Sequence, residues 1–259
     1  MSDRKTISGK FVWFEHESND PKKAQSFYAD VLGWKTRPFP MGGASYDMIF
    51  TGDAPDTMIG GYASPRGARK VPQWVAWLSV NDVDATARDV SANGGKVIEG
   101  PFDMPGVGRG ARIADPQGAE LSLLASADGD RPDADATHGQ FFWNELHTSD
   151  PSAALVFYEK AISFAHRALD MGPAGTYHIV SKGGIDRGGV TPHLRAGAPP
   201  HWLPYVYVDD TDAALARAKK LGAVIPMSPE DIPGIGRFGV LQDPTGVVLA
   251  LMKPLPRAK

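Results

Sequence analysis

The sequence predicts an α+β fold made of two tandem modules that repeat one order of elements. FVWFEHESNDPKKAQSFY (11–28) and FFWNELHTSDPSAALVFY (141–158) are identical at eight of eighteen positions, which indicates an internal duplication. Each copy combines strand-like alternation with one helical stripe and further strand-like runs. The 29 Gly and 22 Pro residues favour many turns and argue against an all-helical protein.

The duplication continues towards the end of each copy. PQWVAWLSVNDVDA (72–85) aligns with PHWLPYVYVDDTDA (200–213), and PGVGRGARIADPQG (105–118) aligns with PGIGRFGVLQDPTG (233–246). The segment between the copies is polar and rich in Asp, Ala and Gly, as is typical of linkers. We therefore predict a first module at 1–125, a linker at 126–139 and a second module at 140–259.

The first half of each module predicts a strand followed by a helix. KFVWFEHES alternates in polarity, which is typical of a strand. Asp20 and Pro21 then provide an N-cap and a first helical residue, and Gly33 fits the C-terminal cap. Helical spacing predicts one buried stripe, formed in the first copy by Ala24, Phe27, Tyr28, Val31 and Leu32 and in the second by Ala154, Phe157, Tyr158, Ala161 and Ile162.

The rest of each module predicts mainly strands. In the first copy we expect short strands near 45–51 and 58–64 and a stronger one at 74–80. Asp82 or Asp84 then begins a second helix, which ends at Gly94-Gly95. Two final strands, 108–115 and 119–126, are joined by an Asp-Pro-Gln-Gly turn. The order strand, helix, three strands is thus expected twice in each module.

Composition excludes several classes of function. The formal net charge is -3, which does not favour nucleic-acid binding. No apolar run approaches the roughly 20 residues of a membrane span, and MSDRKTISGK lacks the apolar segment of a secretory signal. The chain contains no Cys, so it has no disulfides or thiolate sites. We expect a cytoplasmic protein with no nucleic-acid or membrane partner.

The combination of W-x-E, D-P and F-Y with GVGR and DPQG resembles the vicinal oxygen chelate superfamily. This group includes glyoxalases, bleomycin resistance proteins and extradiol dioxygenases, and the resemblance covers both modules. It implies paired βαβββ units in each module, with curved mixed sheets around a cavity that holds the ligand. Many members also hold a divalent metal ion on the cavity wall.

The residues in the positions that the resemblance assigns to metal ligands are not metal ligands. These positions correspond to Trp13, Val75 and Ser122 in the first module and to Trp143, Leu203 and Ala250 in the second. A divalent site needs a converging set of imidazole, carboxylate or carbonyl donors. We therefore predict no metal and no cofactor. His201, just before a strand of the second module, is a lone His of the kind usually found at a surface or in a hydrogen bond.

The same face of the first strand carries aromatic and charged side chains instead. Because strand side chains alternate, Trp13, Glu15 and Glu17 share a face, as do Trp143, Glu145 and His147. Aromatic walls with few polar groups are typical of small-molecule pockets. The predicted ligand-binding residues are Trp13, Glu15, Trp77, Trp143, Glu145, His147, His178, Tyr205 and Tyr207.

Structural alternatives to this pocket stay open. The Trp residues could fill the core instead of stacking on a ligand. Glu15 and Glu145 need partners if they are buried, and we favour structural pairs with the repeated Arg109 and Arg237 over ligand binding.

Three functions remain. We favour metal-independent binding of a small aromatic or amphipathic organic molecule by a monomer or homodimer. The alternative is a glyoxalase-like lyase or isomerase, or a dioxygenase with displaced metal ligands; Glu145 and His147 would then be catalytic, as a general base pair. The third is a structural or interaction protein with filled cavities.

Overall fold

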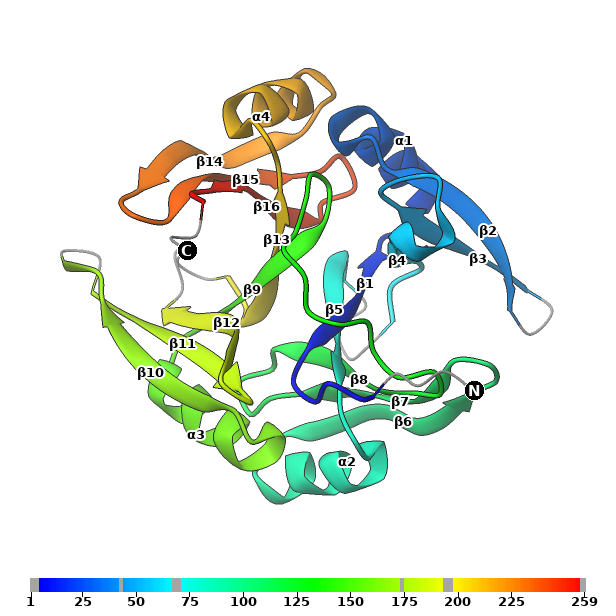
Figure 1. Ribbon diagram of the computed structural model, residues 1–259, viewed down its shortest axis with the longest axis vertical. Coiled ribbons are helices and arrows are strands. Elements are labelled where there is room, and N and C mark those ends of the chain that lie inside the picture. Colours follow the sequence, from blue (N-terminus) through cyan, green and yellow to red (C-terminus); the bar gives the residue numbers. More distant parts are fainter. Residues whose placement is uncertain (1–4, 42–43, 67–70, 173–174, 193–197, 257–259) are drawn as a thin grey trace. The chain divides into compact units, whose positions relative to one another are not determined.

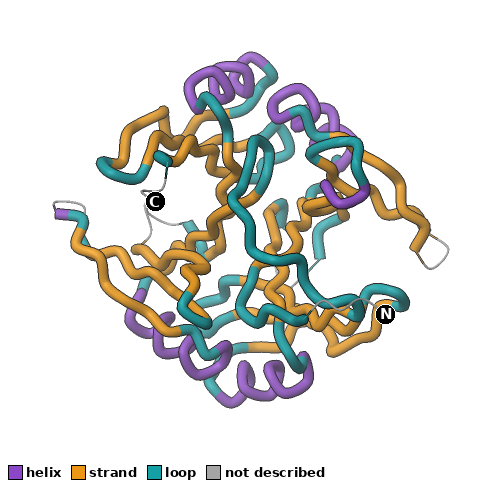
Figure 2. The backbone as a smooth tube through the Cα atoms, in the orientation of Figure 1, coloured by secondary structure: helices purple, strands orange, loops and turns teal. Residues whose placement is uncertain are grey.

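The computed structural model describes residues 5–41, 44–66, 71–172, 175–192 and 198–256. The first copy of the repeat contains β1 (Phe11–Glu17), α1 (Pro21–Leu32), β2 (Lys35–Met41), β3 (Ala44–Phe50), η1 (Pro55–Thr57), β4 (Met58–Ala63), β5 (Gln73–Ser79), α2 (Val83–Ala92), β6 (Lys96–Met104), β7 (Gly108–Ala114) and β8 (Glu120–Ser126). The second copy contains β9 (Phe141–Thr148), α3 (Pro151–Ile162), β10 (Ala165–Asp170), β11 (Thr176–Lys182), β12 (Ile185–Pro192), β13 (His201–Tyr207), α4 (Thr211–Lys220), β14 (Val224–Ile232), β15 (Gly236–Gln242) and β16 (Val248–Pro254). The order strand, helix, three strands therefore occurs twice in each copy, and strands dominate the regular structure (Figure 2).

Each copy forms one eight-stranded mixed sheet, which confirms the predicted α+β class and tandem organisation. The strand orders are β2-β3-β4-β1-β5-β8-β7-β6 and β10-β11-β12-β9-β13-β16-β15-β14. The pairs β1–β4, β5–β8, β12–β9 and β13–β16 are parallel, and the hairpin partners are antiparallel. The same topology in both copies is the structural expression of the sequence repeat.

The predicted caps of α1 are confirmed, whereas α2 ends at Ala92 with Asn93 as its C-cap, just before the predicted Gly94-Gly95. The Asp20 carboxylate accepts a hydrogen bond from Lys23 N–H at the start of α1, and Gly33 adopts the left-handed conformation (φ 70°) at its end. Asp82, not Asp84, caps α2. In α3 the left-handed C-cap is Ser163 (φ 61°). The expected apolar stripes of α1 and α3 are buried.

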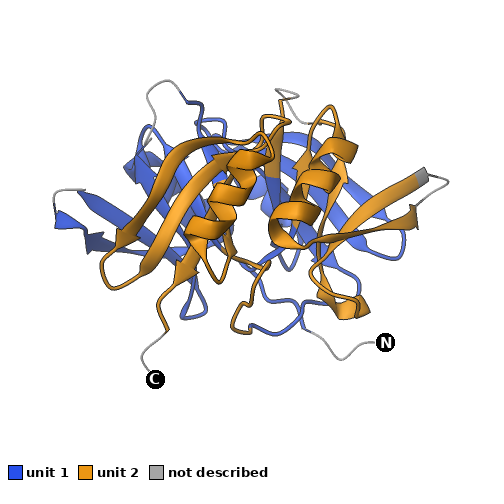
Figure 3. Ribbon diagram, turned by 90° about the horizontal axis from the view of Figure 1, so that it is seen from above, with its two compact units in different colours: residues 1–13, 75–133, 143–202 blue, residues 14–74, 134–142, 203–259 orange. Residues whose placement is uncertain are grey.

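The chain divides into two compact units, and each unit combines segments of both copies (Figure 3). Unit 1 comprises residues 1–13, 75–133 and 143–202, and unit 2 comprises residues 14–74, 134–142 and 203–259. Helices α2 and α3 contact each other within unit 1, and α1 and α4 do so within unit 2 (Figure 1). None of the helices in the described part of the chain has the length and apolarity needed to cross a bilayer.

The predicted linker contributes buried contacts to unit 1. Asp130 is buried and accepts hydrogen bonds from Ile7 N–H and from the Ser79 hydroxyl, both at 2.5 Å. Asp133 receives two hydrogen bonds from the buried Arg187 guanidinium, at 2.8 and 3.0 Å. The linker residues Asp130 and Asp133 therefore hold this segment in place through hydrogen bonds.

Candidate functional site

Strand β9 places a connected group of polar side chains in unit 1. Trp143, Glu145 and His147 alternate along it and share one face. Glu145 is only 7% exposed and His147 only 4%. A buried carboxylate is costly unless other groups compensate it, so its neighbours define the chemistry of the site.

A tyrosine that the sequence analysis missed binds Glu145. The Tyr177 hydroxyl, from β11, donates to Glu145 Oε2 at 2.8 Å, and Trp143 Nε1–H donates to the same hydroxyl at 2.9 Å. Burial raises the pKa of Tyr177 above its ordinary value, and the charge of Glu145 adds to the rise. Tyr177 therefore stays protonated and acts as a hydrogen-bond donor.

A glycine makes room for this contact. Gly189 of β12 lies opposite Glu145 in the parallel register. A Cβ atom at Gly189 would lie 1.7 Å from the Tyr177 hydroxyl oxygen, so any side chain there would displace the tyrosine from the carboxylate.

The second oxygen of Glu145 faces His147. His147 Nε2 lies 2.8 Å from Glu145 Oε1, but the two groups are not aligned as a hydrogen bond. An imidazole beside a carboxylate can exchange a proton with a bound molecule. The cluster can thus anchor a polar ligand group or act as a general base.

The first copy contains a related cluster in unit 2. Glu15 and Glu17 are 3% and 0% exposed, and the Tyr46 hydroxyl donates to Glu15 Oε1 at 3.0 Å. The Arg66 guanidinium pairs with Glu15, and its Nε lies 3.5 Å from Glu17 Oε1. Burial raises the pKa of Glu15 above its ordinary value, although the charge of Arg66 opposes the rise.

The predicted pairing of Glu15 and Glu145 with Arg109 and Arg237 is wrong. Arg109 binds Asp84 of α2 through Nε at 2.5 Å and through a terminal nitrogen at 2.9 Å. Arg237 binds Asp212 of α4 in the same way, at 2.5 and 2.8 Å. The acceptors are the Asp residues repeated in the first turns of these helices, which offer carboxylates that need not be desolvated.

Repeated residues could have revealed the correct partners. Tyr46 and Tyr177 occupy equivalent positions, and each copy contains a Gly-Gly pair in the neighbouring strand, at 60–61 and at 188–189. A Gly pair inside a strand signals close approach of another group. Arg66 has no comparable sequence signal.

The other predicted site residues are distributed over both units. His178 follows Tyr177 on β11, so it points to the opposite face, where its ring lies 6.4 Å from that of His166. Trp13 is half-buried and Trp77 is buried, both in unit 1. In unit 2, Tyr205 stacks on Phe238 and Tyr207 contacts Phe142. That each of these residues lines a ligand cavity of its own module stays a prediction.

The donor set does not fit the metal ion that many relatives of this fold hold. Ser122, which the resemblance places in a ligand position, is buried opposite Trp77 in the register of β8 and β5. Val75, Leu203 and Ala250 are buried apolar residues. Within the described ranges, no three His, Asp or Glu side chains are grouped so that they could hold an ion.

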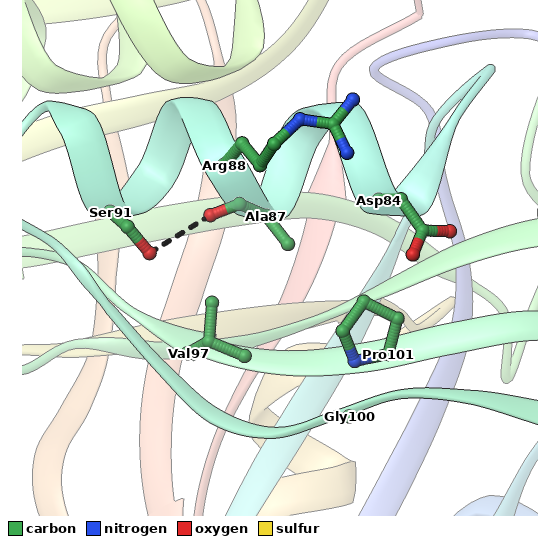
Figure 4. A pocket seen from close by; sticks show the side chains of 7 residues that line it. All are labelled: Asp84, Ala87, Arg88, Ser91, Val97, Gly100 and Pro101. Atoms are coloured by element: carbon green, nitrogen blue, oxygen red, sulfur yellow. Dashed lines mark hydrogen bonds between the residues drawn. The ribbon is translucent and has the colours of Figure 1, made fainter.

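A groove between α2 and β6 of unit 1 shares no lining residue with these clusters (Figure 4). It is lined by Asp84, Ala87, Arg88, Ser91, Val97, Gly100 and Pro101. None of these is a predicted site residue, and Asp84 is already bound to Arg109. We therefore place the candidate site at Glu145.

Comparisons with known proteins agree with this architecture. The family model described as "Glyoxalase/Bleomycin resistance protein/Dioxygenase superfamily" matches residues 11–123. CFP32 of Mycobacterium tuberculosis, whose name carries a provisional glyoxylase assignment, is 34% identical over 250 residues, covering 95% of each chain. The anthracycline biosynthesis protein DnrV of Streptomyces peucetius is 30% identical over 263 residues, covering 95% of this chain and 93% of DnrV.

A solved structure shares the fold at lower identity. The Mn(II)-bound glyoxalase from Novosphingobium aromaticivorans aligns with a TM-score of 0.64 and 20% identity, covering 96% of this chain and 82% of that one.

Proposed function

Because the chain belongs to the glyoxalase/bleomycin resistance protein/dioxygenase superfamily, we propose that it binds a small, partly aromatic or amphipathic organic molecule without a metal ion. The Glu145 cluster is the observation that supports this proposal. A buried carboxylate that accepts a hydrogen bond from a tyrosine and lies close to a histidine, beside an indole, offers polar anchors next to an aromatic surface. The cytoplasmic location and the monomeric or homodimeric state stay predictions.

Ligand screening tests the proposal directly. The full chain is dialysed against a chelator, checked by elemental analysis, and screened by thermal shift and calorimetry against small aromatic and amphipathic compounds. We expect binding in metal-free protein and a loss of about tenfold or more in affinity for Glu145→Gln, because a hydrogen bond to a charged group contributes about 1.5–3 kcal/mol. Glu159→Gln, at an exposed position of α3, is the control and should bind normally. Binding that requires an added divalent ion would contradict the proposal.

A lyase or isomerase activity is the second candidate, favoured by the contact between His147 and Glu145. His147, beside Glu145, would take a proton from a carbon next to a carbonyl group and return it to the neighbouring carbon. The provisional assignment of CFP32 as a glyoxylase supports this chemistry. Turnover of hemithioacetals that disappears in His147→Gln would support it, and unchanged turnover in that variant would contradict it. The dioxygenase alternative needs displaced metal ligands, and no observation in the described residues favours it.

A further inference from the structure

His201 lies against His147, although sequence reasoning gave it no role. Their ring centroids are 5.1 Å apart and the ring planes differ by 14°, so the imidazoles are stacked. His201 begins β13, His147 lies on β9, and both belong to unit 1. The stack brings a second imidazole to the histidine that contacts Glu145.

One of the two rings is held by a hydrogen bond. His201 Nδ1 lies 2.9 Å from the Pro199 carbonyl oxygen. A carbonyl oxygen can only accept, so this nitrogen carries the hydrogen and the tautomer of neutral His201 is fixed. His147 Nε2 lies 2.8 Å from Glu145 Oε1 without hydrogen-bond alignment, so the stack on His201 is the contact that can fix its ring plane.

The first copy differs at both positions. Glu17 stands where the second copy has His147, and Gln73 stands where it has His201. The imidazole pair is thus a property of the second copy alone, in which the candidate site lies.

We propose that His201 is a positioning residue for His147. Stacking fixes the plane of the His147 ring beside Glu145. The ring is thereby kept oriented towards a bound molecule. Among the described residues, Glu145 Oε1 lies 2.8 Å from His147 Nε2, and Tyr177 of β11 donates a hydrogen bond to the other oxygen of Glu145. The inference rests on the proposed role of the Glu145 cluster.

Histidine-selective NMR of the full chain tests the proposal. Relaxation of the His147 ring signals is measured in the wild type, in His201→Phe, which keeps an aromatic face, and in His201→Gln, which introduces the residue of the first copy. We expect an ordered His147 ring in the wild type. His201→Phe should keep the ring order of His147, and His201→Gln should lose it.

The outcomes separate this inference from the proposed function. Identical ring order of His147 in the wild type and in His201→Gln, with thermal unfolding showing intact folds, would overturn the positioning role. Ring order that is lost in His201→Gln and kept in His201→Phe would support that role even if His147→Gln left ligand binding and turnover unchanged, a result that would refute only the function proposed for the cluster. Where a ligand is found, its affinity should fall in His201→Gln and be kept in His201→Phe.

Discussion

At the scale of single residues, the site depends on the absence of a side chain. Gly189 and Gly61 lie opposite Glu145 and Glu15 in the sheet register, and in each copy a Tyr hydroxyl occupies the space above the glycine. The Tyr–Glu hydrogen bond therefore depends on three residues, the Tyr, the Glu and the Gly that leaves room for the hydroxyl. The sequence repeats all three residues in both copies, but it does not show that they lie close together.

Replacing Gly189 with Ala should break the Tyr177–Glu145 hydrogen bond, because the new methyl group and the hydroxyl cannot share the space. We expect a loss of about 1.5–3 kcal/mol in the free energy of unfolding, the contribution of a hydrogen bond to a charged group. Denaturant unfolding measures it. A double-mutant cycle with Tyr177→Phe is the control: the two losses should overlap strongly, and simple additivity would contradict the contact.

Equivalent aspartates of the two Asp-Pro-x-Gly turns have opposite pKa shifts. Burial opposes ionisation of Asp243, but the hydrogen bond from His16 Nε2 at 2.8 Å and the charge of His16 lower its pKa below the ordinary 3.8. Burial raises the pKa of Asp115, which its backbone hydrogen bonds offset only in part. The second copy has Leu146 where the first has His16.

Asn variants of these turns should therefore respond to pH in opposite directions. Because the folded state favours ionised Asp243, its stabilising contribution is present above pH 3.8 and is lost as pH falls through the lower folded value. Asp243→Asn should be destabilising near neutrality and nearly neutral at the acid end. Folding disfavours the ionised form of Asp115, so the contribution of this residue to stability falls as pH rises above 3.8. The stability of Asp115→Asn should therefore increase relative to that of the wild type as pH rises. Urea unfolding from pH 3 to 6 measures how the stability difference between each variant and the wild type changes with pH. A change in the same direction for both variants would contradict the opposite pKa shifts of Asp243 and Asp115.

At the scale of elements, local sequence determined the helices better than the edge strands. Asp-Pro and the left-handed C-caps set the ends of α1 and α3, and these signals act within a few residues. Strands β2 and β6 were not located, because Pro38, Pro40 and Pro101 disfavour strands. Both are edge strands, where the missing N–H of proline is tolerated.

Removing the N-cap of the first helix in either copy should lower the free energy of unfolding by about 1 kcal/mol, because a backbone N–H group of the helix loses its acceptor. Asp20→Ala and Asp150→Ala remove the caps of α1 and α3, whose carboxylates accept from Lys23 and Ala153 N–H at 3.0 and 2.9 Å. Hydrogen exchange should show faster opening confined to the first turn of the affected helix. Equal acceleration in both helices after one substitution would contradict a local role.

At the scale of the whole molecule, the sequence modules and the compact units divide the chain differently. The eight-stranded sheets follow the two copies, whereas each compact unit takes segments from both. Within unit 2, Arg217 of α4 donates to the Val31 carbonyl at the end of α1 at 2.8 Å, and His16 binds Asp243. Residues of one copy therefore complete the core around the other.

Separated copies should not fold independently. Fragments 1–134 and 135–259, cut between two exposed linker residues, should each lack the cooperative unfolding transition of the full chain. Their equimolar mixture should regain it as a one-to-one complex, because mixing restores both compact units. Circular dichroism melting and size-exclusion chromatography test this expectation. Independent folding of each fragment with the stability of the full chain would show that the modules at 1–125 and 140–259 are autonomous domains.

The candidate site was predictable where strand periodicity sufficed. Alternation alone put Trp143, Glu145 and His147 on one face. It could not supply their partners, because Tyr177 and His201 lie on other strands and only sheet pairing brings them near. The same limit produced the wrong partners for Arg109 and Arg237, since the sequence does not give the distance between a strand and a helix.

The sequence by itself determined the repeat, the order of elements, the helix caps and the family, because these depend on contacts between neighbours in the chain or on similarity along it. Only the tertiary structure decided which groups neutralise the buried carboxylates and which segments of the two copies share a core. A buried charge without a partner is costly, so each buried carboxylate needs a nearby hydrogen-bond donor or cation. Which group lies near enough depends on how strands that are distant in the sequence pack together.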